Sequence, residues 1–138
     1  MKLSLKNRFS DTPFSLPSAF LIFLILAFDQ ISKNFVQGKF NVVCNRGLVF
    51  GLGQNVALVS FIFLLVVLVI MGIGKKRFEV LALSFILGGG IANLADRLFF
   101  GCVRDFINFG FRSSFNLADV AISVGVGVLI FSLLFEKE

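Results

Sequence analysis

Two aspartates, Asp105 and Asp119, carry the most informative chemistry in this sequence, and they lie 14 positions apart. Neither has a cationic side chain beside it in helical register, and on an extended segment Arg104 would point away from Asp105. Gly110 supplies a turn that can return the chain to the start of the next apolar run. Two carboxylates that share a proton can activate water and polarise a carbonyl group, as in aspartic proteases. The spacing therefore predicts a site for peptide-bond hydrolysis.

The composition excludes several other kinds of catalytic site. The chain has no histidine, so no Ser-His-Asp or Cys-His site can form, and the commonest ligand of catalytic zinc is missing. Its two cysteines, Cys44 and Cys102, lack C-x-x-C spacing and indicate neither a metal knuckle nor a disulfide framework. We therefore expect carboxylate chemistry with no metal and no cofactor.

The elements that must position these aspartates are membrane spans. Of the 138 residues, 57% are hydrophobic and 15% are charged, whereas soluble domains average about 45–50% apolar and about a quarter charged. The mean hydropathy is +0.96. Four segments are long and apolar enough to span a bilayer: 17–35, 55–74, 78–100 and 116–135. We expect a single all-α membrane domain over residues 1–138, with four transmembrane helices and short loops.

The first segment also fits a cleaved signal peptide, because Lys2, Lys6 and Arg8 precede an apolar run. However, no small-x-small cleavage site follows, and the run continues into the polar residues 29–33. We therefore expect the segment to be retained as a span.

The basic residues indicate the orientation. An even number of spans places both termini on one side, and the dense Lys75-Lys76-Arg77 cluster between the second and third spans favours the cytoplasm for that side. The net charge of +5 comes from scattered residues that form no nucleic-acid footprint. Membrane lipids, rather than nucleic acid, are the expected partners of this charge.

Polar residues inside or beside the spans gather at the opposite boundary. They are Asp29 and Lys33 at the end of the first span, Asn93, Asp96 and Arg97 at the end of the third, and Asn116 and Asp119 at the start of the fourth. Intramembrane ionisable residues are costly and are functional candidates by default. Asp29 and Lys33 also fit a structural ion pair at i, i+4, and Asp96 with Arg97 fits an interface anchor or ion pair.

The start of the fourth span predicts different roles for the two aspartates. Asn116 is a good N-cap, and Asp119 then occupies the third helical position of a capping box. The helix dipole stabilises an anion there. Our hypothesis is that Asp119 is the ionised base and Asp105 the protonated partner.

Small residues on the third and fourth spans indicate close helix packing. They are Gly88-Gly89-Gly90, and the small-xxx-small pairs Ala121 with Gly125 and Ser123 with Gly127.

Five segments of the chain resemble, in order, the motifs of lipoprotein signal peptidase, the type II signal peptidase of bacteria. They are Asp29-Gln30-Ile31-Ser32-Lys33, the segments 45–51 (NRGLVFG), 89–97 (GGIANLADR) and 101–107 (GCVRDFI), and Phe115-Asn116-Leu117-Ala118-Asp119. The match covers residues 29–122 and is most specific in its second half.

The resemblance implies a fold of four transmembrane helices with a small extracytoplasmic β-rich cradle and a short amphipathic helix. It implies a multi-pass aspartic protease of the bacterial cytoplasmic membrane that cuts a prolipoprotein before its diacylglyceryl-modified Cys. Asp105 and Asp119 match the catalytic pair. The residues that match the substrate-binding and supporting shell are Asp29, Lys33, Asn45, Gly47, Asn93, Asp96, Arg97 and Asn116. We expect the enzyme to be a monomer, with cytoplasmic termini and the active site at the extracytoplasmic boundary.

The sequence departs from this family pattern in several places. The stretch from Lys33 to Asn45 is short, so we expect a shortened cradle. Leu48 and Val49 stand where small residues are usual, and Asn108 where an acid is common. With no Trp or Tyr, the interfacial aromatic belt must consist of Phe. Cys44 and Cys102 would both lie on the outer side, and whether they pair is not decided by the sequence.

Two other function classes remain to be compared. A four-span transporter or channel would use the buried acids to couple protons or cations, but such sites lie near the bilayer midplane, often between internal repeats. Here the acids lie at one boundary, and the sequence has no evident repeat. An assembly subunit would tolerate Asp→Asn changes, whereas a protease would not.

Overall fold

The computed structural model describes residues 15–47, 55–73, 76–110 and 113–136. These form, in chain order, α1 (Leu16–Val36), β1 (Val43–Asn45), α2 (Val56–Ile73), α3 (Arg77–Phe100), β2 (Val103–Asp105) and α4 (Leu117–Phe135). Each helix begins and ends within one residue of its expected range, and all four are long and apolar enough to cross a membrane. The predicted fold of four transmembrane helices is confirmed.

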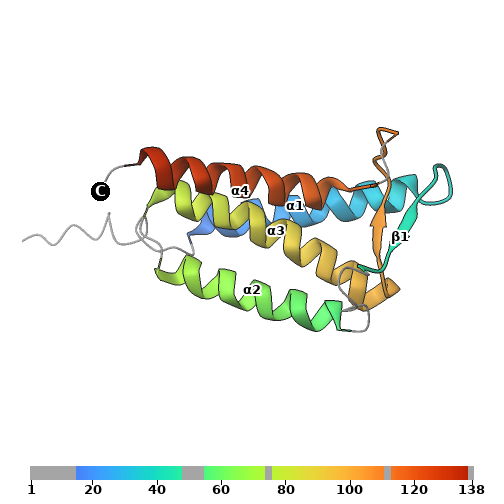
Figure 1. The fold of residues 1–138 in the computed structure, drawn as a ribbon, viewed down its shortest axis with the longest axis horizontal. Helices are drawn as coiled ribbons and strands as arrows, with labels where there is room; N and C mark the ends of the chain where they lie inside the picture. Colours follow the sequence, from blue (N-terminus) through green and yellow to red (C-terminus); the bar gives the residue numbers. More distant parts are fainter. Residues whose placement is uncertain (1–14, 48–54, 74–75, 111–112, 137–138) are drawn as a thin grey trace, which may run out of the picture.

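The helices lie side by side, with α3 at the centre (Figure 1). This helix packs against α1, α2 and α4, whereas α2 packs mainly on α3. α1 begins and α4 ends at one end of the bundle, and the two-stranded sheet lies at the opposite end (Figure 1). The sheet therefore covers the helix ends at which the sequence gathers its polar residues. Lys2, Lys6 and Arg8 before the first span, and Lys75 of the cluster that indicates the orientation, lie outside the described residues.

Three consecutive glycines explain why α3 can hold three neighbours. A Cβ atom at Gly88 would lie 2.9 Å from Ile25 of α1, one at Gly89 would overlap the carbonyl oxygen of Ala118 in α4, and one at Gly90 would overlap Leu64 of α2. Small residues allow such close approach between helices in lipid.

The small residues of α4 divide into two groups. A Cβ atom at Gly125 would lie 2.7 Å from the carbonyl oxygen of Ala82, so this glycine also lies at a close helix contact. The predicted contact at Ser123 and Gly127 is wrong, because both are exposed and a Cβ atom at Gly127 would meet nothing within 4 Å. Of the two small-residue pairs, only the pair that contains Gly125 therefore lies at a close contact between helices.

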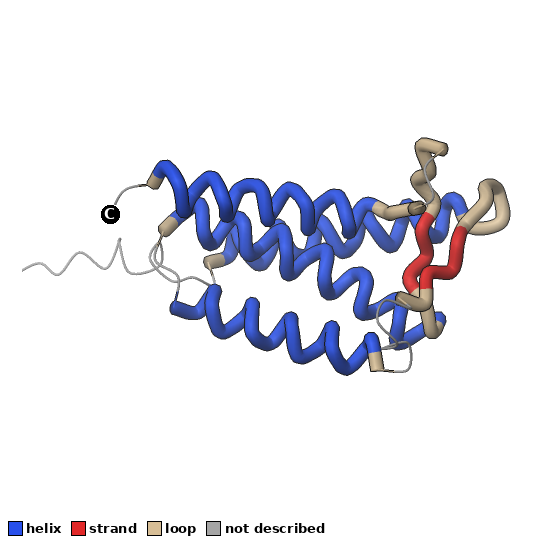
Figure 2. The backbone as a smooth tube through the Cα atoms, in the orientation of Figure 1, coloured by secondary structure: helices blue, strands red, loops and turns tan. Residues whose placement is uncertain are grey.

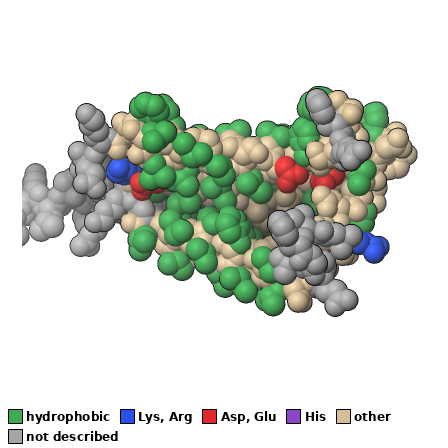
Figure 3. Space-filling view, in the orientation of Figure 1, with side chains coloured by type: hydrophobic (Ala, Val, Ile, Leu, Met, Phe, Trp, Pro, Cys, Tyr) green, Lys and Arg blue, Asp and Glu red, His purple; other side chains and the backbone are tan. Residues whose placement is uncertain are grey.

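The outer surfaces of the helices are apolar. The buried core lies between α2 and α3 and includes Leu64, Met71 and Leu87, while large side chains such as Phe61 and Phe131 are about half exposed. Figure 3 shows hydrophobic side chains over most of the bundle, as expected of helices that face lipid.

β1 and β2 form an antiparallel two-stranded sheet at this end of the bundle (Figure 2). In its register Cys44 lies opposite Arg104. α3 ends in the left-handed residue Gly101 (φ 72°), whose N–H donates to the carbonyl oxygen of Arg97, and this turn sends β2 back over the helix ends. A disulfide joins Cys44 to Cys102 across the two chain segments, with Cα atoms 5.4 Å apart. The cradle is thus present in a shortened form, and a disulfide that the cysteine spacing did not indicate fastens it. The described residues contain no helix besides the four, so the expected amphipathic helix is not among them.

Candidate active site

The chain between the two aspartates folds back on itself. Ile107 and Phe115 form an antiparallel bridge, in which the N–H of Phe115 donates to the carbonyl oxygen of Ile107 at 3.0 Å. Asn116 follows directly and contacts both aspartates. Its Nδ2 donates to Oδ1 of Asp105 at 2.9 Å, and its backbone N–H donates to Oδ2 of Asp119 at 3.1 Å. One residue therefore holds the two carboxyl groups side by side.

Asp119 lies in the capping box that the sequence predicts. Its backbone N–H donates to Oδ1 of Asn116 at 2.9 Å, while its carboxylate accepts from the Asn116 backbone. Asn93 of α3 adds a second donor, with its Nδ2 2.8 Å from Oδ1 of Asp119. Two N–H donors therefore hold the Asp119 carboxyl group in place at the start of α4.

Asp105 has a different environment. It is only 2% exposed, and each carboxyl oxygen accepts from an amide, Oδ2 from Asn45 at 3.1 Å and Oδ1 from Asn116. Burial raises the pKa of Asp105 above its ordinary value, and the negative charge of Asp119 adds to that rise. The two amide donors oppose it without cancelling it. Acidic side chains are visible on the surface near the sheet end of α4 (Figure 3).

Asn45 and Gly47 form a small turn beside Asp105. The backbone N–H of Gly47 donates to Oδ1 of Asn45 at 2.8 Å, which leaves the Asn45 amide nitrogen directed at Asp105. Gly47 has a φ of 64°, and an added Cβ would lie 3.1 Å from Val56, so glycine suits the position. Leu48 and Val49 lie outside the described residues.

Asp29 and Lys33 form the predicted i, i+4 ion pair, with Nζ 2.6 Å from Oδ2. Both side chains are completely buried, so Lys33 does not reach out to the membrane interface. Nζ of Lys33 also contacts Oδ1 of Asn93 at 3.3 Å, which directs the Asn93 amide nitrogen toward Asp119. Asp29 in turn accepts from the backbone N–H of Ala118 at 2.9 Å. The ion pair thus orients the start of α4 and one donor to Asp119.

Asp96 and Arg97 do not form the ion pair that their adjacency suggested. Asp96 pairs with Lys33 at 3.2 Å and with Arg104 at 2.9 Å. Within the described part of the chain the buried Nε of Arg97 has no hydrogen-bond partner, and the guanidinium lies within electrostatic range of Asp119, Asp105 and Asp96. Arg97 thus lies on the side of the two catalytic candidates, while Asp96 faces α1 and β2.

Sequence reasoning missed Arg104 and Gln30, which complete this region. Arg104 does point away from Asp105, as an extended strand requires, but it is buried and bonded to Asp96 and Gln30. Helical spacing could not reveal this contact, because the turn at Gly101 separates Arg104 from α3. Nε2 of Gln30 donates to Asp96 at 3.0 Å. The available signal was that both residues lie in segments that resemble the family motifs, Gln30 in 29–33 and Arg104 in 101–107. Across the described residues, no three His, Cys, Asp or Glu side chains form a group that could hold a metal ion.

Comparisons with known proteins agree with this arrangement. The family model described as Signal peptidase (SPase) II matches residues 21–135. The chain belongs to the signal peptidase II family. A lipoprotein signal peptidase of Syntrophomonas wolfei is 37% identical to it, over 87% of this chain and 93% of that protein. One of Moorella thermoacetica is 35% identical, over 86% of this chain and 93% of that protein.

The fold has a counterpart among solved structures. A bacterial membrane enzyme superposes with a TM-score of 0.81 over 92% of this chain and 98% of its own, at 22% identity. A signal peptidase is a protease that removes signal peptides. This signal peptidase II is accordingly a protease and a multi-pass bacterial membrane protein.

Proposed function

We propose that this signal peptidase II is an aspartic endopeptidase that cuts prolipoproteins directly before their diacylglyceryl-modified cysteine, with Asp105 and Asp119 as the catalytic residues. The observation that carries the proposal is the shared donor Asn116, which bonds both carboxyl groups. Among the described residues neither aspartate forms an ion pair, and amides hold both. Carboxyl groups held by neutral donors stay free to exchange a proton with substrate and water.

The different environments of Asp119 and Asp105 indicate which step of peptide-bond hydrolysis each of them carries out. Asp119, held by two donors at a helix start, is the carboxylate that takes a proton from water as the water oxygen bonds to the scissile carbonyl carbon. Asp105, whose pKa burial raises, is the protonated group that donates a hydrogen bond to the carbonyl oxygen. When the tetrahedral intermediate collapses, the C–N bond breaks and the leaving nitrogen takes from Asp119 the proton that Asp119 removed from water, which regenerates the carboxylate. The products are the free signal peptide and a lipid-modified cysteine with a new amino terminus.

The remaining site residues support these two. Asn45, Asn93 and Asn116 fix the carboxyl groups, and Gly47 orients Asn45. Arg97, with an unused buried donor near both aspartates, is suited to bind the substrate.

The same proposal includes a location and a setting for the enzyme. We place the termini in the cytoplasm and the active site at the extracytoplasmic boundary, in a monomer surrounded by membrane lipids. The end of the bundle with the sheet is opposite the end at which α1 begins, which supports this orientation (Figure 1). A fluorescent protein fused to the C-terminus should therefore fold and fluoresce in living cells. A folded periplasmic reporter at the same position would contradict the orientation.

A cleavage assay tests the proposed chemistry. The purified protein, incubated with a diacylglyceryl-modified preprotein, should yield a shortened product whose first residue is the lipidated cysteine, as shown by mass spectrometry. Asp105→Asn and Asp119→Asn should abolish the product. Glu79→Gln, which removes a carboxylate from the first turn of α3 at the far end of the bundle, should leave the rate unchanged. Cleavage by either Asp→Asn variant at the wild-type rate would overturn the two-aspartate mechanism.

A further inference from the structure

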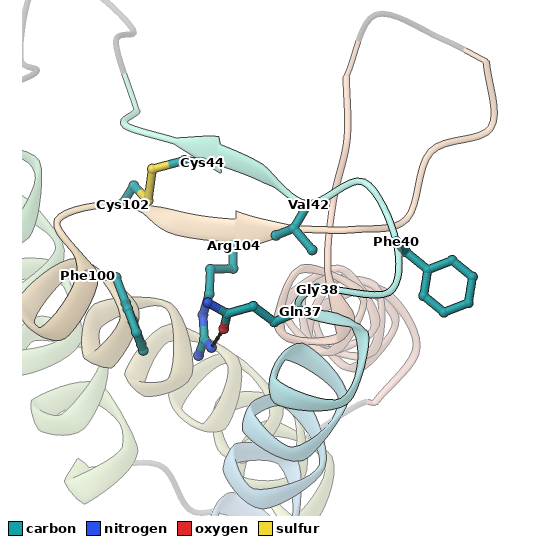
Figure 4. Close-up of a pocket in the computed structure, with 8 residues that line it drawn as sticks. All are labelled: Gln37, Gly38, Phe40, Val42, Cys44, Phe100, Cys102 and Arg104. Carbon is teal, nitrogen blue, oxygen red and sulfur yellow. Dashed lines mark hydrogen bonds between the residues drawn. A yellow bond between two sulfur atoms is a disulfide. The ribbon is translucent and has the colours of Figure 1, made fainter.

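The guanidinium of Arg104 occupies a position that the proposed chemistry does not use. Arg104 is 4% exposed and extends from β2 toward the ends of α1 and α3, beneath the sheet (Figure 4). It borders a depression of about 440 Å³ that is also lined by Phe40, Val42 and Phe100. Because side chains alternate along a strand, Arg104 and Asp105 lie on opposite faces of the sheet. This depression is therefore not the site of the two aspartates.

The guanidinium joins α1 to α3. Nη1 donates to Asn34 at 2.7 Å and to Gln37 at 3.1 Å, and Nη2 donates to Gln30 at 3.0 Å. Toward α3, Nη2 and Nε donate to the two oxygens of Asp96 at 2.9 and 3.3 Å. Its five N–H groups thus meet acceptors on both sides. A planar fork of donors can do this, whereas a single ammonium cannot.

Other contacts of the same residue fix its place on α3. The guanidinium carbon lies 4.0 Å from the centre of the Phe100 ring (Figure 4). The Arg104 backbone N–H donates to Oδ2 of Asp96 at 2.9 Å. The disulfide joins Cys44 of β1 to Cys102, which lies in the short link between α3 and β2, and makes no connection to α1. Besides the two-residue chain link to α3, Arg104 therefore supplies the hydrogen bonds that hold β2 against the ends of α1 and α3.

We infer that Arg104 is a positioning residue of the protease, which holds β2 so that Asp105 keeps its place relative to Asp119. The inference rests on the proposed function, since it gives Asp105 a catalytic role. Asp105 follows Arg104 directly in the strand, so a shift of the Arg104 backbone moves the Asp105 carboxyl group. A displacement of about 1 Å at a reacting group lowers rates by about 10²-fold.

Three variants test this role in the cleavage assay. Arg104→Lys keeps the charge but loses the fork, and Arg104→Met loses both. The double variant Asp96→Asn/Arg104→Met removes the guanidinium and also the Asp96 charge that the guanidinium pairs with, so no carboxylate is left without its partner. Lys39→Gln, which removes an exposed positive charge after α1, is the control. For each variant kcat, KM and the melting temperature in detergent are measured.

Positioning predicts that kcat falls about 10–100-fold in both single variants, while KM stays within about twofold because the substrate contacts remain. The double variant should regain much of the melting temperature of the wild-type protein, because no buried charge is left uncompensated, but its kcat should stay low. Lys39→Gln should match the wild type in all three quantities.

Two results would overturn the inference. One is an unchanged kcat in Arg104→Lys and Arg104→Met, and the other is a kcat that recovers together with the melting temperature in the double variant. If Arg104→Met does not accumulate, Arg104→Lys and the double variant decide the question by the same criteria. Asp105→Asn in the same assay separates the two proposals. If it is inactive while the Arg104 variants are normal, only the positioning role fails, whereas an active Asp105→Asn removes the proposed function itself.

Discussion

Two polar clusters lie side by side at the sheet end of the bundle, and they handle charge in opposite ways. The first, here the ion cluster, consists of Asp29, Lys33, Asp96 and Arg104. The second, here the aspartate pair, consists of Asp105 and Asp119 with the amides of Asn45, Asn93 and Asn116. In the ion cluster two carboxylates meet two cations, so the charges balance. In the aspartate pair the donors are neutral. The difference separates an ion-paired framework from the two amide-bound carboxyl groups that we propose as the catalytic site.

The two clusters touch at Asn93. Its carbonyl oxygen accepts from Lys33 of the ion cluster and from Asn116, and its amide nitrogen donates to Asp119. Because the cation faces the carbonyl oxygen, the amide cannot flip without placing its N–H groups against Lys33. The ion cluster thus sets the direction of a hydrogen bond in the aspartate pair without placing a cation against Asp119.

The largest expected effect is a loss of cleavage rate, without a matching loss of stability, when Asp119 of the aspartate pair is changed. Asp119→Asn keeps the size of the side chain but cannot take a proton from water. Loss of a general base lowers rates by about 10²–10⁴-fold, and we expect cleavage to fall by at least about 10³-fold. The melting temperature in detergent should change little, because no ion pair is broken. A large drop in melting temperature would mean that Asp119 belongs to the framework instead.

The same kind of substitution in the ion cluster should lower the stability of the fold much more than Asp119→Asn does. Asp96→Asn leaves Arg104 without its carboxylate and weakens the environment of Lys33. Removing one partner of a buried ion pair costs about 3–5 kcal/mol, and we expect a loss near the lower figure because Gln30, Asn34 and Gln37 still accept from Arg104. Urea or thermal unfolding in detergent measures it. Unfolding at the wild-type midpoint would show that the cluster does not support the fold.

The aspartate pair could be found from the sequence, and most of the ion cluster's partners could not. Helix bounds follow from long apolar runs, and Asp119 follows from a local capping pattern with Asn116. Arg104 reaches Asp96 only because α3 reverses at Gly101, which brings together residues that no helical spacing relates. Pairwise contacts of this kind depend on how elements dock.

Two further features show the same limit. The pairing of Cys44 with Cys102 depends on the register of two strands that are 58 residues apart in sequence, which cysteine spacing could not supply. Ser123 and Gly127 have the same spacing as Ala121 and Gly125, yet they face outward. Small residues permit a close helix contact, and the docking of the helices decides which of them make one.

The disulfide should matter mainly to the aspartate pair, because it fastens β1 and therefore Asn45. Disulfides contribute about 2–4 kcal/mol in typical cases. We expect Cys44→Ser/Cys102→Ser to lower the unfolding free energy by about the smaller figure. The matched comparison is wild-type protein under reducing conditions, which should behave like the double variant. Equal stability and equal cleavage rates in oxidised, reduced and double-variant protein would show that the short cradle holds its shape without the bond.

The smallest expected effect is a change in the pH dependence of cleavage when the hydrogen bond from Asn45 to Asp105 is removed. Asp105 is protonated below its raised pKa, so if it acts as the acid, activity declines as the pH rises through that pKa. The hydrogen bond from Asn45 favours the charged form and lowers the pKa of Asp105. Asn45→Ala should therefore raise the pKa further and move the alkaline limb of kcat/KM to higher pH.

Asn108→Ala is the matched control, since Asn108 is exposed and its described bond is to the backbone of Gly110. Its pH profile should coincide with that of the wild type. Asn45→Ala also tests which aspartate is the acid and which is the base. If Asp105 is the base, the rise in its pKa acts on the acid limb of the profile and not on the alkaline limb. In that case the acid limb would move to higher pH and the alkaline limb would stay in place. Movement of the acid limb alone would exchange the roles of the two aspartates while leaving the pair itself as the site of hydrolysis, because the titrating group would still be the one that Asn45 contacts.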